Sequence, residues 1–564
     1  MVNYGCSKGC VTCKQRRVKC DQAKPKCRTC HRLGLQCEGY QIKCTTLKFK
    51  EQNHKFCNEI NRARVARDEN QASSPRALAE PDTSVSFFFQ YYAGMGRSLE
   101  SARGFFEVLI PLYCSQTQES PLMLAVSAVA SEILSLWRRD YCQTSRDIYI
   151  QAVKCLRSTL KNHNEWGKPG TISAVLALQL YENVAAVFGL RSGTSIHHNA
   201  ALSLLPFASS NKAGGMTHIL LQRFILHSEI CSAMRQERAL EDTAHSWVKS
   251  TDLIASTDNP SPRLDAIGAT VAELQASYMQ FVTQDGSITS SQNAPRDWIF
   301  EAKRLDDQLL AWSRNVPDYW QPLKLRSGQD VDSSIPTYRF LCEVYPTCQI
   351  GTIWNLWRVQ RLLLLRIIFS LHAIAYPQKF EDRADKTSPS DEHLGDYVQT
   401  LQELVDSVCH SVPFYLGNRS NPLHLADFGD TKILLPSPRS LAVVQDERRF
   451  DKQGQKGQTS REYYRRHIIA QGPWHIMSPL SRLLTLFSEG HGQSMASFLR
   501  PGQHEWIRKQ FMRVTYLLRI PLPVNSGKSK LYTLTKLPGQ EPTDSEIEYL
   551  AKEVRNGAIF MSGP

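Results

Sequence analysis

Six cysteines near the N-terminus repeat one spacing, and this repeat constrains the fold more than any other feature of the chain. Each half of the repeat reads Cys-x2-Cys-x6-Cys, and the second half follows the first at a constant offset. A Cys-x2-Cys turn brings two sulfur atoms to one side of the chain, and a tetrahedral set of thiolates suits zinc. The first half is Cys10, Cys13 and Cys20, and the second is Cys27, Cys30 and Cys37.

The number of cysteines indicates how the metal is shared. Two separate four-sulfur sites need eight ligands, so six thiolates can serve two zinc ions only if two sulfurs bridge. The pseudo-symmetry of the repeat predicts Cys10 and Cys27 as the bridges. One zinc then takes Cys10, Cys13, Cys20 and Cys27, and the other takes Cys10, Cys27, Cys30 and Cys37. The alternatives are a single structural zinc with two spare thiols, and a redox cluster.

The distribution of cysteine favours metal ligands over disulfides. Nine of the 16 cysteines lie between Cys6 and Cys57, and Met1 to Gly9 lacks the apolar stretch of a secretory signal. In a chain that is not exported, dense cysteines are typical of metal sites. Cys6, Cys44 and Cys57 lie outside the repeat, and we expect them to be free thiols.

The positive charge of the chain is concentrated in the same region. Residues 1–67 hold 16 Lys and Arg against four acids, which gives +12 of the total net charge of +13. The rest of the chain is almost neutral. A basic N-terminal region on a neutral body indicates a polyanion as the partner of that region, most often nucleic acid.

Within this basic region, the segment between Cys13 and Cys20 is the best candidate for contact with DNA bases. It contains Lys14, Arg16, Arg17 and Lys19, and it has no Gly or Pro. Such a segment can form about one and a half helical turns, fit the major groove and donate hydrogen bonds to guanine. We expect the other basic residues to contact phosphates, which position a protein without specifying sequence; these are Lys14, Lys19, Lys24, Lys26 and Arg28. The alternative for each of these basic residues is a charged side chain in solvent that makes no specific contact with DNA.

Residues 10–37 resemble the fungal binuclear zinc cluster DNA-binding domain. The resemblance rests on the cysteine spacing, the basic segment after Cys13, Asp21 after the third cysteine, and Pro25 in the connecting loop. It implies a zinc-dependent regulator of RNA polymerase II genes in the nucleus that binds double-stranded DNA. It also implies a CGG-type triplet in the major groove, with Arg17 at the base-reading position and Arg16 beside it.

A polar linker is expected over residues 38–84. Its Arg62, Arg64 and Arg67, together with the basic segment 14–19, could serve nuclear import. Many members of the family carry a coiled coil at this place. Residues 40–85 show no sustained apolar heptad repeat, which leaves dimerisation open.

The body, residues 85–520, is predicted to be a large all-α domain. Apolar helical patterns cover 121–137, 171–188 and 354–376, and Ser478-Pro479 is expected to open a fourth helix. The body resembles the fungal-specific transcription factor regulatory domain. Residues 380–397 are rich in acids and are expected to form an exposed loop. Residues 521–564 are expected to form a C-terminal tail with one helix at 544–554. The fold class is therefore mostly α: a small two-zinc cluster with short helices, followed by a helical body.

Other functional classes fit the sequence less well. The most apolar stretches, 121–137 and 354–376, contain charged residues and favour core helices over membrane spans. The sequence contains no phosphate-binding loop, HExxH helix or GxSxG elbow. His197, His198 and His504 belong to no catalytic motif. No enzyme is therefore predicted. Two alternatives stay open: a co-regulator whose cluster binds protein, and an enzyme with an appended zinc module. The body could also receive a coactivator, a corepressor or a small-molecule effector.

Overall fold

The chain divides into two compact units, Met1–Leu78 and Ala79–Pro564. The computed structural model describes residues 10, 12–13, 16, 18, 20–21, 23, 27–37, 83–95, 101, 103–138, 144–189, 194–208, 215–248, 259–283, 294–375, 389–437, 461–488, 493–521 and 542–557. Most of the expected linker, up to residue 82, lies outside these residues. In the first unit, helix α2 spans Arg28–Arg32, and Thr12 and Cys13 are also helical.

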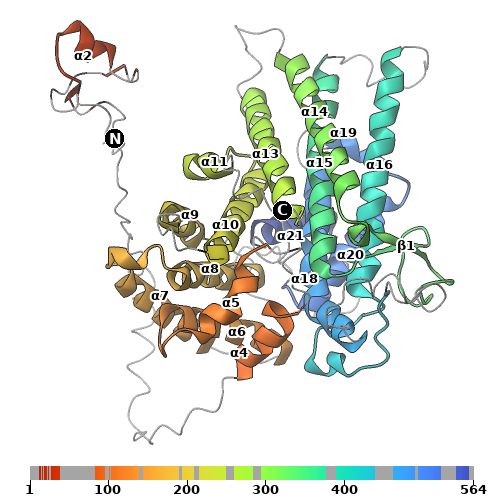
Figure 1. The fold of residues 1–564 in the computed structure, drawn as a ribbon. Helices are drawn as coiled ribbons and strands as arrows, with labels where there is room; N and C mark the ends of the chain where they lie inside the picture. Colours follow the sequence, from red (N-terminus) through yellow and green to blue (C-terminus); the bar gives the residue numbers. More distant parts are fainter. Residues whose placement is uncertain are drawn as a thin grey trace, which may run out of the picture. The chain divides into compact units, whose positions relative to one another are not determined.

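Among its described residues, the second unit is built from helices and one two-stranded sheet, which confirms the mostly α fold class (Figure 1). Its first helices are α4 (Thr83–Phe88), η1 (Phe89–Ala93), α5 (Phe105–Cys114), α6 (Pro121–Arg138), α7 (Thr144–Thr159), η3 (His163–Glu165), α8 (Pro169–Gly189), α9 (Ile196–Ala208), α10 (Gly215–Gln236) and α11 (Asp242–Val248). The later elements are α13 (Ser261–Thr283), α14 (Ala294–Asn315), η4 (Asp318–Trp320), β1 (Leu323–Arg326), β2 (Leu341–Val344), α15 (Cys348–Ala375), α16 (Pro389–Leu416), η6 (Leu425–Phe428), α18 (Arg461–Ser488), α19 (Gln493–Ala496), α20 (Gln503–Leu518) and α21 (Asp544–Gly557).

Helices α6 and α8 pack against each other and organise the N-terminal half of this unit. Helix α6 begins as expected: the Ser120 hydroxyl accepts a hydrogen bond from the Met123 N–H at 3.3 Å, and Pro121 occupies the first helical position. Helix α8 is buried on almost every side from Thr171 to Phe188, which fits its nearly continuous apolar sequence. Both helices are long and apolar enough to span a membrane, but half of α6 and 83% of the tested window of α8 are buried against the protein.

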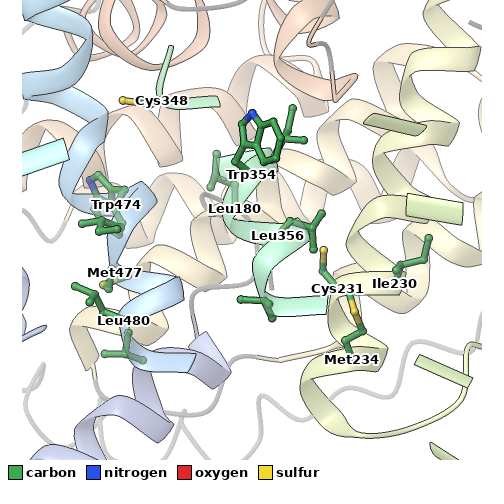
Figure 2. Close-up of a cluster of buried hydrophobic side chains, with 14 of the residues drawn as sticks. Leu180, Ile230, Cys231, Met234, Cys348, Trp354, Leu356, Trp474, Met477 and Leu480 are labelled. Carbon is green, nitrogen blue, oxygen red and sulfur yellow. The ribbon is translucent and has the colours of Figure 1, made fainter. Parts of the chain in front are cut away.

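Helix α18 has the same organising role in the C-terminal half. It packs against α15, α16, α20 and α21. Its apolar residues meet those of α8, α10 and α15 in one buried cluster, in which Trp474, Leu180, Met234 and Leu356 are labelled (Figure 2). The core of the second unit therefore joins helices that are far apart in the sequence.

The prediction that Ser478-Pro479 opens a helix is wrong, because α18 runs unbroken from Arg461 through both Pro473 and Pro479. A proline inside a helix removes one N–H and leaves the carbonyl four residues earlier without its helical donor. For Pro473 that carbonyl belongs to Ile469, and it accepts a hydrogen bond from Arg419 Nη1 at 2.9 Å. A distant side chain thus replaces the missing helical bond.

Two further segments differ from the simple all-α picture. Strands β1 and β2 pair antiparallel, with Leu323 opposite Val344, and were not expected. The acidic segment 380–397 is not all loop, since residues 389–397 form the first turns of α16.

The helix expected at 544–554 is present as α21. It packs on α18 and α8. Its buried residues, Ile547, Leu550, Ala551 and Val554, follow helical spacing. Helix α21 is therefore part of the packed body.

Candidate zinc centre and nucleic-acid interface

The six cysteines of the repeat come together in the first unit. Cys10, Cys13, Cys27 and Cys30 are almost completely buried there, and Cys20 and Cys37 are partly buried against them. Because so short a segment has little apolar surface to bury, the sulfur cluster forms its core.

The sulfur atoms form two groups of four, and two cysteines belong to both. The Sγ atoms of each group lie within 4.8 Å of one another. The first group is Cys10, Cys13, Cys20 and Cys27, and the second is Cys10, Cys27, Cys30 and Cys37. These are the two ligand sets predicted from the spacing, with Cys10 and Cys27 in both.

The distances between sulfurs fit zinc. Four sulfurs placed tetrahedrally about 2.3 Å from a zinc ion lie about 3.8 Å from each other. The Sγ of Cys10 is 3.6 Å from that of Cys27 and 3.8 Å from that of Cys30. The Sγ of Cys13 is 3.7 Å from those of Cys27 and Cys30, so the two groups adjoin. The six cysteines can therefore hold two zinc ions.

The two halves of the repeat use the same local geometry. The N–H of Cys13 donates to the Sγ of Cys10 at 3.4 Å, and the N–H of Cys30 donates to the Sγ of Cys27 at 3.3 Å. Each Cys-x2-Cys turn thus orients its leading sulfur by the same backbone hydrogen bond. Burial and the neighbouring thiol of Cys10 raise the pKa of Cys13 to about 12. Zinc binding must therefore displace a proton from this thiol.

Asp21 fixes the second half of the cluster, a role that was not predicted. Its carboxylate accepts hydrogen bonds from the N–H groups of Arg28 and Thr29 at 3.1 and 3.4 Å, at the start of α2. Although burial acts in the opposite direction, these N–H groups lower the pKa of Asp21. The acid caps a helix that begins well after it in the sequence, so a search for local capping patterns does not find it.

The predicted DNA-contacting segment is described only in part. The N–H of Arg16 donates to the carbonyl of Thr12 at 3.2 Å, the spacing of one helical turn, and Arg16 is exposed. Lys14, Arg17 and Lys19 lie outside the described residues, as do Lys24 and Lys26. Arg28 is exposed on the first turn of α2.

Sequence comparison places this geometry in a known domain. Residues 8–47 match the fungal Zn(2)-Cys(6) binuclear cluster domain. The matched domain includes all six cysteines and the basic segment. The match ends far before the helical body, whose resemblance to a fungal regulatory domain stays a prediction.

Two curated proteins of Emericella nidulans are similar to parts of the chain. Transcription factor dbaG is 22% identical over 354 residues, which cover 61% of this chain and 76% of that protein. The aspercryptin biosynthesis cluster-specific transcription regulator atnN is 56% identical over 32 residues, which cover 6% of this chain and 5% of that protein. No solved structure matches the chain. The zinc cluster domain and these relatives support a DNA-binding transcription regulator.

Proposed function

We propose that this protein is a nuclear, sequence-specific DNA-binding regulator of genes transcribed by RNA polymerase II. The observation that carries the proposal is the pair of four-sulfur groups joined at Cys10 and Cys27. Two zinc ions bound there fold a short basic segment that cannot form a hydrophobic core of its own. The similarity of 354 residues to transcription factor dbaG, and of 32 residues to the transcription regulator atnN, supports the same function.

Within the cluster, we assign the metal to all six cysteines, with Cys10 and Cys27 bridging. Lys14, Arg16, Arg17 and Lys19 then follow the first cysteine pair directly. Arg17 reads guanine in a CGG-type triplet, with Arg16 beside it, because arginine can donate two hydrogen bonds to O6 and N7 of that base. Lys14 and Lys19 contact the phosphates on either side.

The proposed division of the chain follows from these roles. Residues 10–37 bind DNA, residues 38–84 link the cluster to the body, and residues 85–520 form the regulatory domain. Residues 521–564 follow it in the sequence, and their helix α21 packs on the domain. The body would then bring coactivators or corepressors to the promoter.

Genome-wide occupancy of the protein, compared with the transcripts that change when its gene is deleted, tests the proposal. The expected result is that occupied promoters share a CGG-containing site and overlap with the affected genes. The Cys27→Ser protein, which loses a sulfur shared by both groups, should lose this occupancy. Occupancy that persists in Cys27→Ser, or that has no common sequence, would support a co-regulator recruited through protein contacts.

A further inference from the structure

Four arginines from four different helices meet where α10 ends. They are Arg235 on α10, Arg366 on α15, Arg482 on α18 and Arg555 on α21, and all four are buried. Met234, the residue before Arg235, lies in the buried cluster where α8, α10, α15 and α18 converge (Figure 2). This cluster of positive charge is therefore inside the helical body.

Hydrogen bonds join α21 to the end of α10 and to α18. Arg555 Nη2 donates to the carbonyl of Arg235 at 2.6 Å, and Arg555 Nη1 donates to the hydroxyl of Thr485 at 3.2 Å. The carboxylate of Glu237, the residue that follows α10, pairs with Arg366. Although burial acts in the opposite direction, Arg366, Arg482 and Arg555 hold the pKa of Glu237 below its usual value.

Arg235 differs from its neighbour Arg366 because its side chain forms no ion pair among the described residues. Its Nε and Nη2 are buried and have no hydrogen-bond partner in the part of the chain that the structure describes. Burial lowers the pKa of Arg235 to about 10, and the nearby guanidinium groups of Arg238 and Arg555 add like charge. A buried guanidinium whose edge lacks both hydrogen bonds and a counter-ion is strongly unfavourable, so this arrangement indicates a missing partner.

The unsatisfied atoms of Arg235 also indicate what that partner is. Nε and Nη2 lie on one edge of the guanidinium and point in parallel, which suits two oxygens of a single anion. Two other arginines of this protein use the same edge in this way. Arg361 donates from Nε and Nη2 to Asp306 at 2.6 and 2.9 Å, and Arg304 donates from the same atoms to Glu301.

We propose that the junction of α10 and α21 is a binding site for a small oxyanion, a phosphate or a carboxylate, held by the Nε–Nη2 edge of Arg235. Arg555 of α21 donates to the carbonyl of Arg235, and the two guanidinium groups repel each other, so a bound anion offsets this repulsion and stabilises the packing of α21 on α10. Because the site is buried, the anion enters when α21 moves off the body. Bound anion therefore holds α21 in its docked position. Through this site, an anionic metabolite can control whether α21 is docked on the body.

The full-length, zinc-loaded protein without DNA provides the test. Its thermal unfolding is followed during titration with inorganic phosphate, and separately with malonate, at constant ionic strength and pH. We expect a saturable rise of several degrees in Tm, because a ligand that binds only the folded state stabilises it. Whichever anion acts at the lower concentration identifies the phosphate or the carboxylate class. Hydrogen exchange in residues 544–557 should slow at the same concentrations.

Variants of Arg235 separate this site from general salt effects. Arg235→Lys keeps the charge but lacks the two-donor edge, and should raise the half-saturating concentration at least tenfold. Arg235→Met should abolish the response. Arg304→Met removes an exposed arginine and should respond like the natural protein. The proposal is overturned if the natural protein shows no saturable response, or if Arg235→Lys responds as the natural protein does.

Discussion

The Sγ atoms of Cys10 and Cys27 lie 3.6 Å apart, and these two residues belong to both four-sulfur groups of the cluster. Every other cysteine of the repeat belongs to one group. The two bridging cysteines occupy equivalent positions at the start of each Cys-x2-Cys pair. Their loss should therefore affect both metal ions at once.

Replacement of a bridging cysteine should remove more zinc than replacement of a terminal one. Cys27→Ser takes a ligand from both groups, whereas Cys20→Ser takes one from the first group only. We expect Cys27→Ser to bind less than one zinc per chain and Cys20→Ser to keep more, as measured by elemental analysis after gel filtration. Cys44→Ser, outside the repeat, should keep two. Equal zinc loss in Cys27→Ser and Cys20→Ser would contradict the shared arrangement.

Removal of the proposed base-reading side chain should reduce specificity. Arg17→Ala should weaken binding to a CGG-containing duplex by about 1–3 kcal/mol and relax the preference at one base position. Lys24→Ala, which removes a phosphate contact, should weaken binding to all sequences alike and reduce the salt slope by about 1. Titrations of matched and substituted duplexes at several salt concentrations measure both effects. If Arg17→Ala weakens all duplexes equally, Arg17 contacts phosphate.

The cysteine cluster was predictable because its geometry is set locally. The spacing of Cys10, Cys13 and Cys20 recurs in the second half of the repeat and determines which sulfurs can share a metal, and the structure groups them in that way. The start of α6 was predictable for the same reason, since Ser120 and Pro121 act within one helical turn.

Contacts between distant parts of the chain were not predictable from one sequence. Pro473 and Pro479 would normally interrupt a helix, and only the packed fold brings Arg419 to the carbonyl of Ile469. Arg235 and Arg555 are 320 residues apart in the sequence, so nothing local to either one indicates that they meet. In these cases tertiary packing, and not the local sequence, determines which residues are in contact.

The buried ion pairs of Glu229 should make the stability of the body depend on pH. Glu229 accepts hydrogen bonds from Arg238 at 2.6 and 2.9 Å and lies 2.7 Å from His198 Nε2. Although burial acts in the opposite direction, Arg238 and His198 lower its pKa to about 2, from an ordinary 4.5. The stabilisation is therefore fully present above pH 4.5 and is lost as the pH falls towards 2.

Glu229→Gln should remove this dependence. We expect it to lower the free energy of unfolding at pH 7 by about 3 kcal/mol at most, and the difference from the natural protein should shrink below pH 4.5. Urea unfolding followed by tryptophan fluorescence measures the effect in the body, since every tryptophan lies at or beyond Trp137. Glu505→Gln, which removes an exposed partner of Arg508, should change stability by only a few tenths of a kcal/mol. If the free energies of unfolding of Glu229→Gln and the natural protein differ by the same amount at all pH values, the lowered pKa of Glu229 is contradicted.

The close contact of α16 with α18 depends on Gly472. A Cβ added there would lie 2.2 Å from the carbonyl oxygen of Tyr415, a backbone atom that cannot move aside. Gly472→Ala should therefore destabilise the body by about 1–3 kcal/mol. The matched control is Gly395→Ala on α16, where an added Cβ meets no atom within 4 Å. This substitution should raise the free energy of unfolding by about 0.5–1 kcal/mol. Urea unfolding of both variants measures the two effects, and a neutral Gly472→Ala would show that the helices can separate at this point.

Selection of sequences from a random pool of double-stranded DNA by the full-length protein tests the central claim most directly. The zinc-loaded protein should enrich duplexes that contain a CGG triplet. Removal of zinc by a chelator, or the Cys27→Ser substitution, should abolish the enrichment. Enrichment that survives the loss of zinc, or a zinc-loaded protein that enriches no sequence, would contradict the account.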